Sequence, residues 1–177
     1  DTNWENDALY IGQYLIKVNS DSSGQFTVKD GTIGIASFAF SNCDSVTSVV
    51  LPNGLLAVNE FAFFFCSNLQ EVVLPSSLKY IDRCAFDSCS SLQEIKLPSD
   101  LEYLGASAFC SCQALFNVDF SGLLESQYLT TIRSYTFGDC AKLKAVSIPK
   151  SVTIIEEDAF SGCTALTDIT VVSDNTT

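Results

Sequence analysis

The sequence predicts a solenoid, in which short parallel strands stack into a curved, right-handed coil with an irregular or 3-10 convex side. Three observations support this prediction: a repeat of about 23 residues, an alternation of apolar residues within each copy, and Pro after most strand-like stretches. One copy cannot bury its own apolar residues, whereas stacked copies bury them in continuous columns. A helical alternative is excluded because no long window keeps the i, i+3, i+4, i+7 spacing of an apolar helix face.

The clearest mark of the repeat is an Ala-Phe-x-x-Cys step, with Thr136 in place of Ala in one copy. Consecutive Cys residues of the six steps lie 23, 23, 23, 28 and 23 positions apart. One equivalent position per coil becomes a column in the stack, so we expect these six thiols to be reduced and buried. Cys84 and Cys110 lie outside the column, and we expect Cys110 to be the most exposed thiol. The column residues are Cys43, Cys66, Cys89, Cys112, Cys140 and Cys163.

A strand-like stretch follows each Cys, and its alternating apolar residues turn every second side chain outward. A second apolar pair, such as Leu55 and Val58, follows in the later part of most copies. Pro cannot donate a hydrogen bond to a strand ladder, so it is expected at a strand end. Four of the stretches end in this way, at Pro52, Pro75, Pro98 and Pro149.

The array has predicted boundaries on both sides. Residues 1–28 are expected to form an N-terminal cap, in which residues 8–28 make a β-hairpin with its turn at residues 19–24. The repeat array is expected to cover residues 29–172. Residues 173–177 read as a tail or linker to a further C-terminal region, because we see no comparable cap there. The alternative for that end is packing against another copy of an otherwise monomeric protein.

The repeat resembles a known family. The pattern Cys-x-x-Leu-x-x-Ile-x-Leu-Pro-x-x-Leu-x-x-Ile-x-x-x-Ala-Phe is similar to the BspA-type leucine-rich repeats of bacterial, and some protozoan, surface proteins. The likeness covers about residues 26–172, and residues 9–17 resemble the segment that opens such arrays in gut Firmicutes proteins. It implies a leucine-rich-repeat solenoid at the cell surface or outside the cell. It also implies a role in adhesion, with a protein or glycan as the ligand. Such ligands include host extracellular-matrix proteins, for example fibronectin.

Three surfaces are candidate binding sites. Leucine-rich-repeat proteins usually bind through outward strand positions, and here these form a mildly acidic face. The repeat that is five residues longer than the others adds an exposed loop, unless its leucines fold back on the core. Two extra phenylalanines follow one Ala-Phe step and are expected to be partly exposed, unless they pack against Phe38 and Phe40. The candidates are Glu71, Val73, Glu94, Lys96, Asn117 and Asp119 on the strands, Leu123, Leu124 and Tyr128 in the loop, and Phe64 and Phe65.

Charge and composition restrict the function further. Net charge is −12 and the nine basic residues are scattered, which argues against nucleic acid and anionic membranes as partners. No apolar run is long enough to span a membrane. The chain has no His, the commonest general base and a frequent metal ligand, so we predict no enzyme, cofactor or metal site. Two functions stay open: a binding module, or a structural spacer or stalk that presents another domain.

Overall fold

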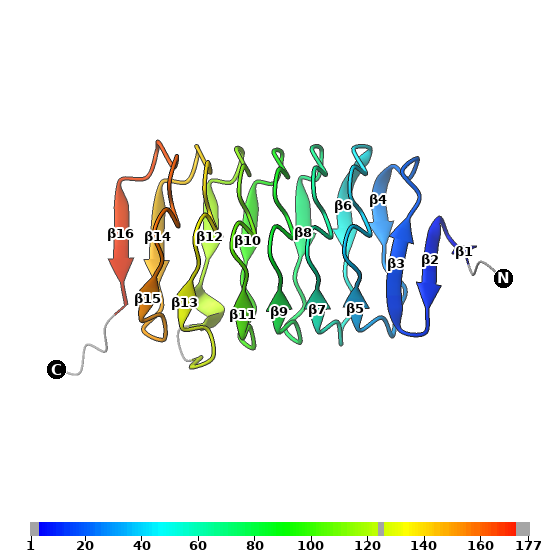
Figure 1. Ribbon diagram of the computed structural model, residues 1–177, viewed down its shortest axis with the longest axis horizontal. Helices are drawn as coiled ribbons and strands as arrows, with labels where there is room; N and C mark the ends of the chain where they lie inside the picture. The colour runs from blue at the N-terminus through cyan, green and yellow to red at the C-terminus, as the bar shows by residue number, and fades with distance from the viewer. Residues whose placement is uncertain (1–3, 124–125, 173–177) are drawn as a thin grey trace.

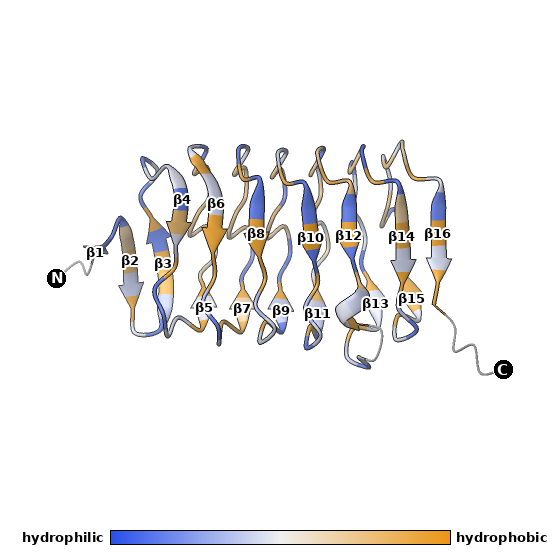
Figure 2. Cartoon of the chain, turned by 180° about the vertical axis from the view of Figure 1, so that it is seen from behind, coloured by the Kyte–Doolittle hydropathy of each residue, from blue (hydrophilic) through white to orange (hydrophobic). Residues whose placement is uncertain are grey.

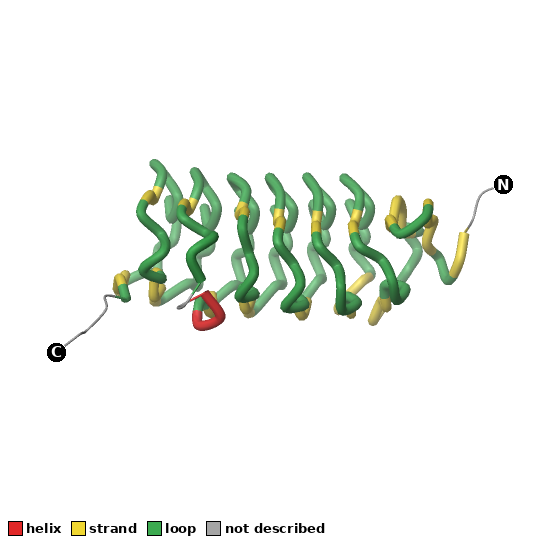
Figure 3. The backbone as a smooth tube through the Cα atoms, turned by 90° about the horizontal axis from the view of Figure 1, so that it is seen from below, coloured by secondary structure: helices red, strands yellow, loops and turns green. Residues whose placement is uncertain are grey.

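The computed structural model describes residues 4–123 and 126–172, which form one stack of coils. The coils follow one another along a single axis, so that the two ends of the chain lie at opposite ends of the stack (Figure 1). Seen from below, each coil is a flattened loop made mostly of turns, with short strands on two sides (Figure 3). The predicted solenoid of short parallel strands is therefore confirmed.

The strands that follow the Cys residues form one side of the stack. They pair in parallel as β4-β6-β8, β10-β12 and β14-β16. The alternation is clearest in β8 and β10, where Val72 and Ile95 are buried and the residues on either side of them are exposed; in β16, on the last described coil, all four residues are exposed. The strands are β4 (Gly24–Thr27), β6 (Val46–Val50), β8 (Glu71–Val73), β10 (Glu94–Lys96), β12 (Asn117–Asp119), β14 (Ala145–Ile148) and β16 (Asp168–Val171).

A second set of strands lies on the other side of the coils. Both residues of the second apolar pair are buried in most copies, as Leu55 and Val58 are, whereas Ile155 of the last copy is exposed. The five extra residues of the long repeat separate this set into β3-β5-β7-β9-β11 and β13-β15. The described helix is the 3-10 turn η1 (Ser121–Leu123) within that insertion. The strands are β3 (Tyr14–Val18), β5 (Gly34–Ile35), β7 (Ala57–Val58), β9 (Tyr80–Ile81), β11 (Tyr103–Leu104), β13 (Thr131–Ile132) and β15 (Ile154–Ile155).

The N-terminal hairpin is present, but its turn lies elsewhere than predicted. β1 (Trp4–Glu5) and β2 (Ala8–Ile11) run antiparallel to each other, and β2 runs antiparallel to β3. The turn between β2 and β3 is Gly12-Gln13, where Gly12 has a φ of 58°. Residues 19–24 instead lead into β4, which pairs in parallel with β6 and so belongs to the repeat ladder. The physical reason is that Phe26 of β4 packs edge-on against the core ring of Phe40, at 5.2 Å.

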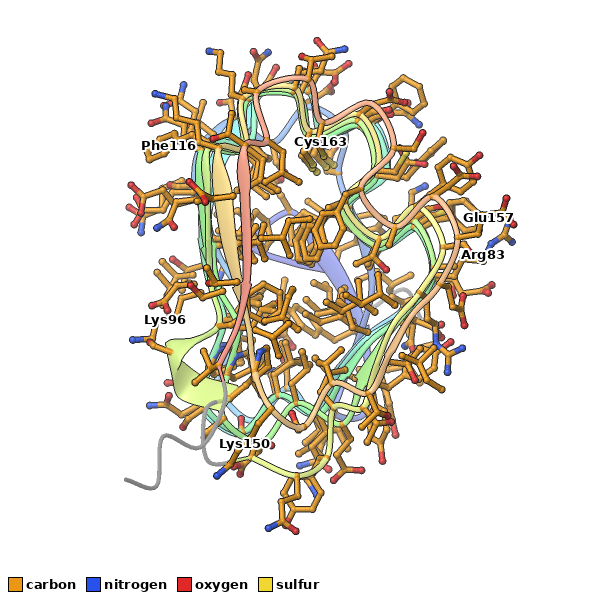
Figure 4. All side chains as sticks on the ribbon, turned by 90° about the vertical axis from the view of Figure 1, so that its left-hand side faces the viewer. Arg83, Lys96, Phe116, Lys150, Glu157 and Cys163 are labelled. Atoms are coloured by element: carbon orange, nitrogen blue, oxygen red, sulfur yellow. The ribbon has the colours of Figure 1, made fainter. Side chains whose placement is uncertain are left out.

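A column of stacked phenylalanine rings runs through the centre of the coils (Figure 4). Successive ring centroids lie 4.5, 4.8, 5.1, 5.8 and 5.5 Å apart, and the planes are within 17° of parallel. Offset stacking at these distances adds to the free energy of burying the rings. The column holds one ring from each Ala-Phe or Thr-Phe step: Phe40, Phe63, Phe86, Phe109, Phe137 and Phe160.

The cysteine column links each coil to the one before it. The Cys89 thiol donates a hydrogen bond to the backbone carbonyl of Phe63, at 3.2 Å. The same hydrogen bond, to the phenylalanine carbonyl of the preceding coil, is made at 3.0–3.3 Å by Cys66, Cys112, Cys140 and Cys163. All eight cysteines are free thiols, and five of the six column members are buried, as predicted. Cys163 is half-buried, because the last described coil has no neighbour beyond it.

Two backbone positions in each coil adopt left-handed conformations that the sequence pattern did not indicate. They lie five residues and one residue before the column Cys, with φ between 53° and 62° at the non-glycine examples. For an L-residue with a side chain, this region costs roughly 1–2 kcal/mol. The positions are Phe38, Phe61, Cys84, Ser107, Tyr135 and Asp158 in one set, and Asn42, Phe65, Ser88, Ser111, Asp139 and Gly162 in the other.

We expect Phe86→Ala to lower the free energy of unfolding by about 3–5 kcal/mol, because the ring is fully buried between two others. Phe160→Ala should cost less than about half of that, since Phe160 is half-buried at the end of the column. Urea denaturation followed by circular dichroism measures both values. Equal losses would show that the column does not act as a continuous core.

The thiol column makes stability depend on pH. Burial raises the pKa of the Cys43 thiol from 9.0 to about 12, so the folded chain holds that proton more tightly than the unfolded chain. The associated stability is therefore complete below pH 9 and is lost as the pH rises from 9 towards 12.

In native protein at about pH 8, an alkylating reagent should react with Cys110 and Cys163, which are half-buried. The other six thiols should react only after unfolding, as mass spectrometry of digested protein can show. Rapid native labelling of Cys89 would contradict the buried column.

Candidate functional site

The outward side chains of β6, β8, β10, β12, β14 and β16 form a continuous surface, here called the strand face. Hydrophilic residues occupy the starts of β8, β10 and β12 on this side of the molecule (Figure 2). Of the six strand residues predicted as candidates, five are exposed and Asp119 is half-buried. The parallel register sets Glu94 beside Asn117, and Lys96 beside Asp119.

A groove of about 530 Å³ lies on the strand face and brings these six predicted residues together. An adjoining hollow of about 260 Å³ adds Val50 and shares Glu71 and Val73 with the groove. Val73 is 65% exposed and Val50 is 42% exposed, so both aliphatic side chains are accessible on the strand face. The groove is lined by Glu71, Val72, Val73, Leu74, Ser76, Glu94, Ile95, Lys96, Leu97, Pro98, Ser99, Asn117 and Asp119.

The charges along the groove are unevenly compensated. Lys96 forms an ion pair with Asp119 at 3.5 Å. Hydrogen bonding by Ser121, together with that ammonium group, lowers the pKa of Asp119. Glu94 accepts a hydrogen bond from the Asn117 amide at 3.3 Å. With three carboxylates and one ammonium group among its lining residues, the groove carries a formal charge of −2.

The groove lies where the ladder of the strand face is interrupted. Within the described part of the chain, β6 pairs with β8 and β10 pairs with β12, but no ladder joins β8 to β10. A second interruption, between β12 and β14, coincides with the five-residue insertion, whereas the coils on either side of the first have equal length. The interruption therefore lies between β8 and β10, the two strands that contribute most of the groove's charged lining residues.

The insertion offers less surface than predicted. Leu123 is fully buried, so its candidacy as a ligand contact is wrong: the side chain folds back on the core. A Cβ on Gly122 would lie 2.8 Å from the Leu97 carbonyl oxygen, which shows how closely the insertion approaches the neighbouring coil. Leu124 lies outside the described residues. Tyr128 is 62% exposed and remains a candidate.

Phe64 and Phe65 belong to a larger aromatic patch, which also includes Phe38 and Phe61. Phe65 is 48% exposed and Phe64 is half-buried, in agreement with the prediction of partial exposure. Phe38 stacks on Phe61 with centroids 5.0 Å apart, and Phe64 contacts Phe61 and Phe65 edge-on. Phe38 and Phe61 were not predicted as candidates, although their separation of 23 residues places them at one repeat position.

The aromatic patch and the strand face lie on different sides of the solenoid. The Arg83 guanidinium lies over the Phe61 ring, 5.5 Å from its centroid. Viewed along the axis, Arg83 projects from the side opposite to Lys96 of the strand face (Figure 4). A partner bound in the groove therefore leaves the aromatic patch free.

Catalytic and metal-binding chemistry finds little support in the described residues. No group of three or more Cys, Asp or Glu side chains within residues 4–123 and 126–172 is arranged to hold a metal ion. In the same part of the chain, no helix is long and apolar enough to cross a membrane. Of the groove carboxylates, Glu71 and Glu94 are exposed, and Asp119 is half-buried and paired with Lys96. What the arrangement offers is a shaped, charged surface.

Comparison with known proteins gives a consistent picture. The family model described as BspA type Leucine rich repeat region matches residues 10–128 and 130–177, in six copies. The leucine-rich repeat protein of T. pallidum is 27% identical with a TM-score of 0.81, and the match covers 89% of this chain and 73% of that protein.

Two further solved structures share the fold at lower identity. A leucine-rich repeat protein from Eubacterium ventriosum is 23% identical with a TM-score of 0.64, over 97% of this chain and 50% of that one. The pneumococcal vaccine antigen PcpA is 21% identical with a TM-score of 0.70, over 96% and 46%. The chain thus spans half or less of the length of these two proteins. A comparison with curated protein sequences gave no match.

We expect Glu71→Gln to leave the free energy of unfolding unchanged or to raise it by a few tenths of a kcal/mol, as measured by urea denaturation. Glu71 is exposed and Glu94 occupies the equivalent position in the next coil, so the substitution removes a like-charge neighbour. A loss of more than about 1 kcal/mol would show that Glu71 has a structural role.

Proposed function

The chain belongs to the BspA-type leucine-rich-repeat family, and from that premise we propose that it is a non-catalytic protein-binding module. It acts at a cell surface or outside the cell, and it binds its partner through the strand face. The groove of about 530 Å³ carries this proposal, because it gathers six outward side chains from three consecutive coils. Ligand sites are concave surfaces with a few well-placed polar groups, and this groove has both features.

Rigidity supports a binding role. The groove residues project from strands whose neighbours Val72, Ile95 and Val118 are at most 5% exposed. Side chains held on a packed scaffold lose little further freedom on binding, which favours affinity. The outward positions, by contrast, take no part in the core, so they can differ between copies without loss of the fold.

A second candidate function is that of a spacer or stalk that presents another domain and binds nothing itself. The observation that favours it is the straight, regular stack of coils, in which each coil contacts only its neighbours (Figure 1). The exposed groove and the aromatic patch argue for the binding module instead, because a spacer needs neither.

The adhesion hypothesis predicts binding to host matrix proteins. We expect the protein to bind at least one member of an immobilised panel that includes fibronectin, as measured by surface plasmon resonance. Changing Glu71, Glu94 and Asp119 together to Lys should abolish that binding, because the charge of the groove is reversed. Phe65→Asn tests the aromatic patch, and Tyr128→Ser tests the insertion without disturbing the buried Leu123.

The panel also distinguishes the two functions. Binding that survives the triple change but is lost in Phe65→Asn would move the site to the aromatic patch. If the protein binds neither any member of the panel nor intact cells, the spacer function is favoured. The melting temperature of each variant must match that of the parent, so that loss of binding is not loss of fold.

A further inference from the structure

The groove combines two kinds of side chain that call for a particular partner. Glu71 and Glu94 occupy the same position on consecutive coils, and together with Gln70 and Gln93 they line one shared hollow of about 410 Å³. Among the described residues, none of the four ion pairs within 4.0 Å involves either carboxylate. A cationic group placed between these two carboxylates is attracted by both of them at once.

Aliphatic surface lies directly beside this carboxylate pair. Val50 and Val73 are partners in the parallel ladder of β6 and β8, and both are exposed. Val73 and Glu71 line both the groove and the adjoining hollow, so the two spaces form one site centred on these two residues. On the far side, Lys96 is paired with Asp119, which keeps the ammonium group from neutralising Glu71.

We propose that the strand face binds an extended protein segment in which an arginine and an aliphatic residue stand two positions apart. The arginine lies between Glu71 and Glu94, and the aliphatic side chain lies on Val50 and Val73. This assignment rests on the proposed function, since it names the partner chemistry of the same surface. A guanidinium group fits better than an ammonium group, because its planar set of donors can serve two carboxylates at once.

The two-residue spacing follows from strand geometry. Glu71 and Val73 point to the same side of β8 and are separated by one inward residue, Val72. In any extended chain, residues two apart point to one side and lie roughly 6.5–7 Å apart. A segment lying along β8 therefore presents Arg-x-Leu or Leu-x-Arg, according to its direction, whereas adjacent Arg-Leu residues point to opposite sides. The net charge of −12 also favours approach of a basic partner.

The test uses short synthetic peptides and the whole chain. Gly-Ser-flanked peptides carry Arg-Ser-Leu, Leu-Ser-Arg, the composition-matched Arg-Leu-Ser, or the charge-reversed Glu-Ser-Leu. Binding is followed by nuclear magnetic resonance titration up to about 1 mM peptide in about 0.15 M salt. We expect one of the first two peptides to bind and to shift the amide signals of residues 71–73 and 94–96. Arg-Leu-Ser should bind at least about fivefold more weakly, and Glu-Ser-Leu should not bind.

Matched variants separate the site from the general charge. Glu71→Gln with Glu94→Gln should weaken binding about tenfold, because both contacts to the guanidinium group become neutral. Val50→Thr with Val73→Thr should weaken it about threefold to fivefold. The control is Glu60→Gln with Glu157→Gln, which removes the same charge from exposed positions, and Glu157 projects from the opposite side of the solenoid (Figure 4). This control should bind as the parent does.

Several results would overturn the proposal. The first is that the control variant and the Glu71→Gln, Glu94→Gln variant lose the same amount of affinity. The second is that Arg-Leu-Ser binds as tightly as Arg-Ser-Leu and Leu-Ser-Arg. The third is that neither Arg-Ser-Leu nor Leu-Ser-Arg binds at concentrations up to about 1 mM. Failure here is distinguishable from failure of the proposed function. If no peptide binds, yet the triple charge reversal abolishes binding to a matrix protein, the strand face is the site and the partner chemistry is wrong.

Discussion

Every coil of this solenoid depends on the contact between its own phenylalanine ring and the rings of the coils beside it. The rings stack face to face at 4.5–5.8 Å, so each of the inner rings, from Phe63 to Phe137, has both faces covered. The cysteine three residues after each ring donates its thiol hydrogen to the backbone carbonyl of the column phenylalanine in the preceding coil. Ring and thiol together fix the distance and register between coils without a covalent link. This explains why a chain with eight free thiols needs no disulfide to join its coils.

This column accounts for much of the remaining geometry. Because it sets one spacing for all coils, the strands on either side fall into parallel register, and the outward residues form aligned rows. The exceptions follow from the same constraint. Five extra residues cannot be absorbed into a coil of fixed spacing, so they project beside the core and interrupt the pairing of strands on both sides of the stack. Leu123 returns to the core because the insertion would otherwise expose it.

The aromatic patch places bulky side chains at turn positions where the coil requires a left-handed backbone. Phe38, Phe61 and Phe65 all occupy left-handed positions, where Asn, Asp or Gly would be less strained. Asn42, Asp139 and Gly162 stand at the position equivalent to Phe65, and Asp158 stands at the position equivalent to Phe38 and Phe61. Bulky aromatic residues at these positions, half exposed and stacked on one another, are consistent with a contact surface. Their stacking and the Arg83 guanidinium over Phe61 offset part of the strain.

The sequence by itself determined the solenoid, because a fixed spacing of Phe and Cys in six copies has one economical explanation in three dimensions. It also determined which strand residues point outward, since alternation is a local property of a strand. Tertiary structure alone decided the rest. Whether Leu123 packs inward depends on the space left by the neighbouring coil, and whether β4 joins a hairpin or the ladder depends on the core partner of Phe26. The left-handed turns and the interruption between β8 and β10 arise from how whole coils meet, and no short stretch of sequence encodes that.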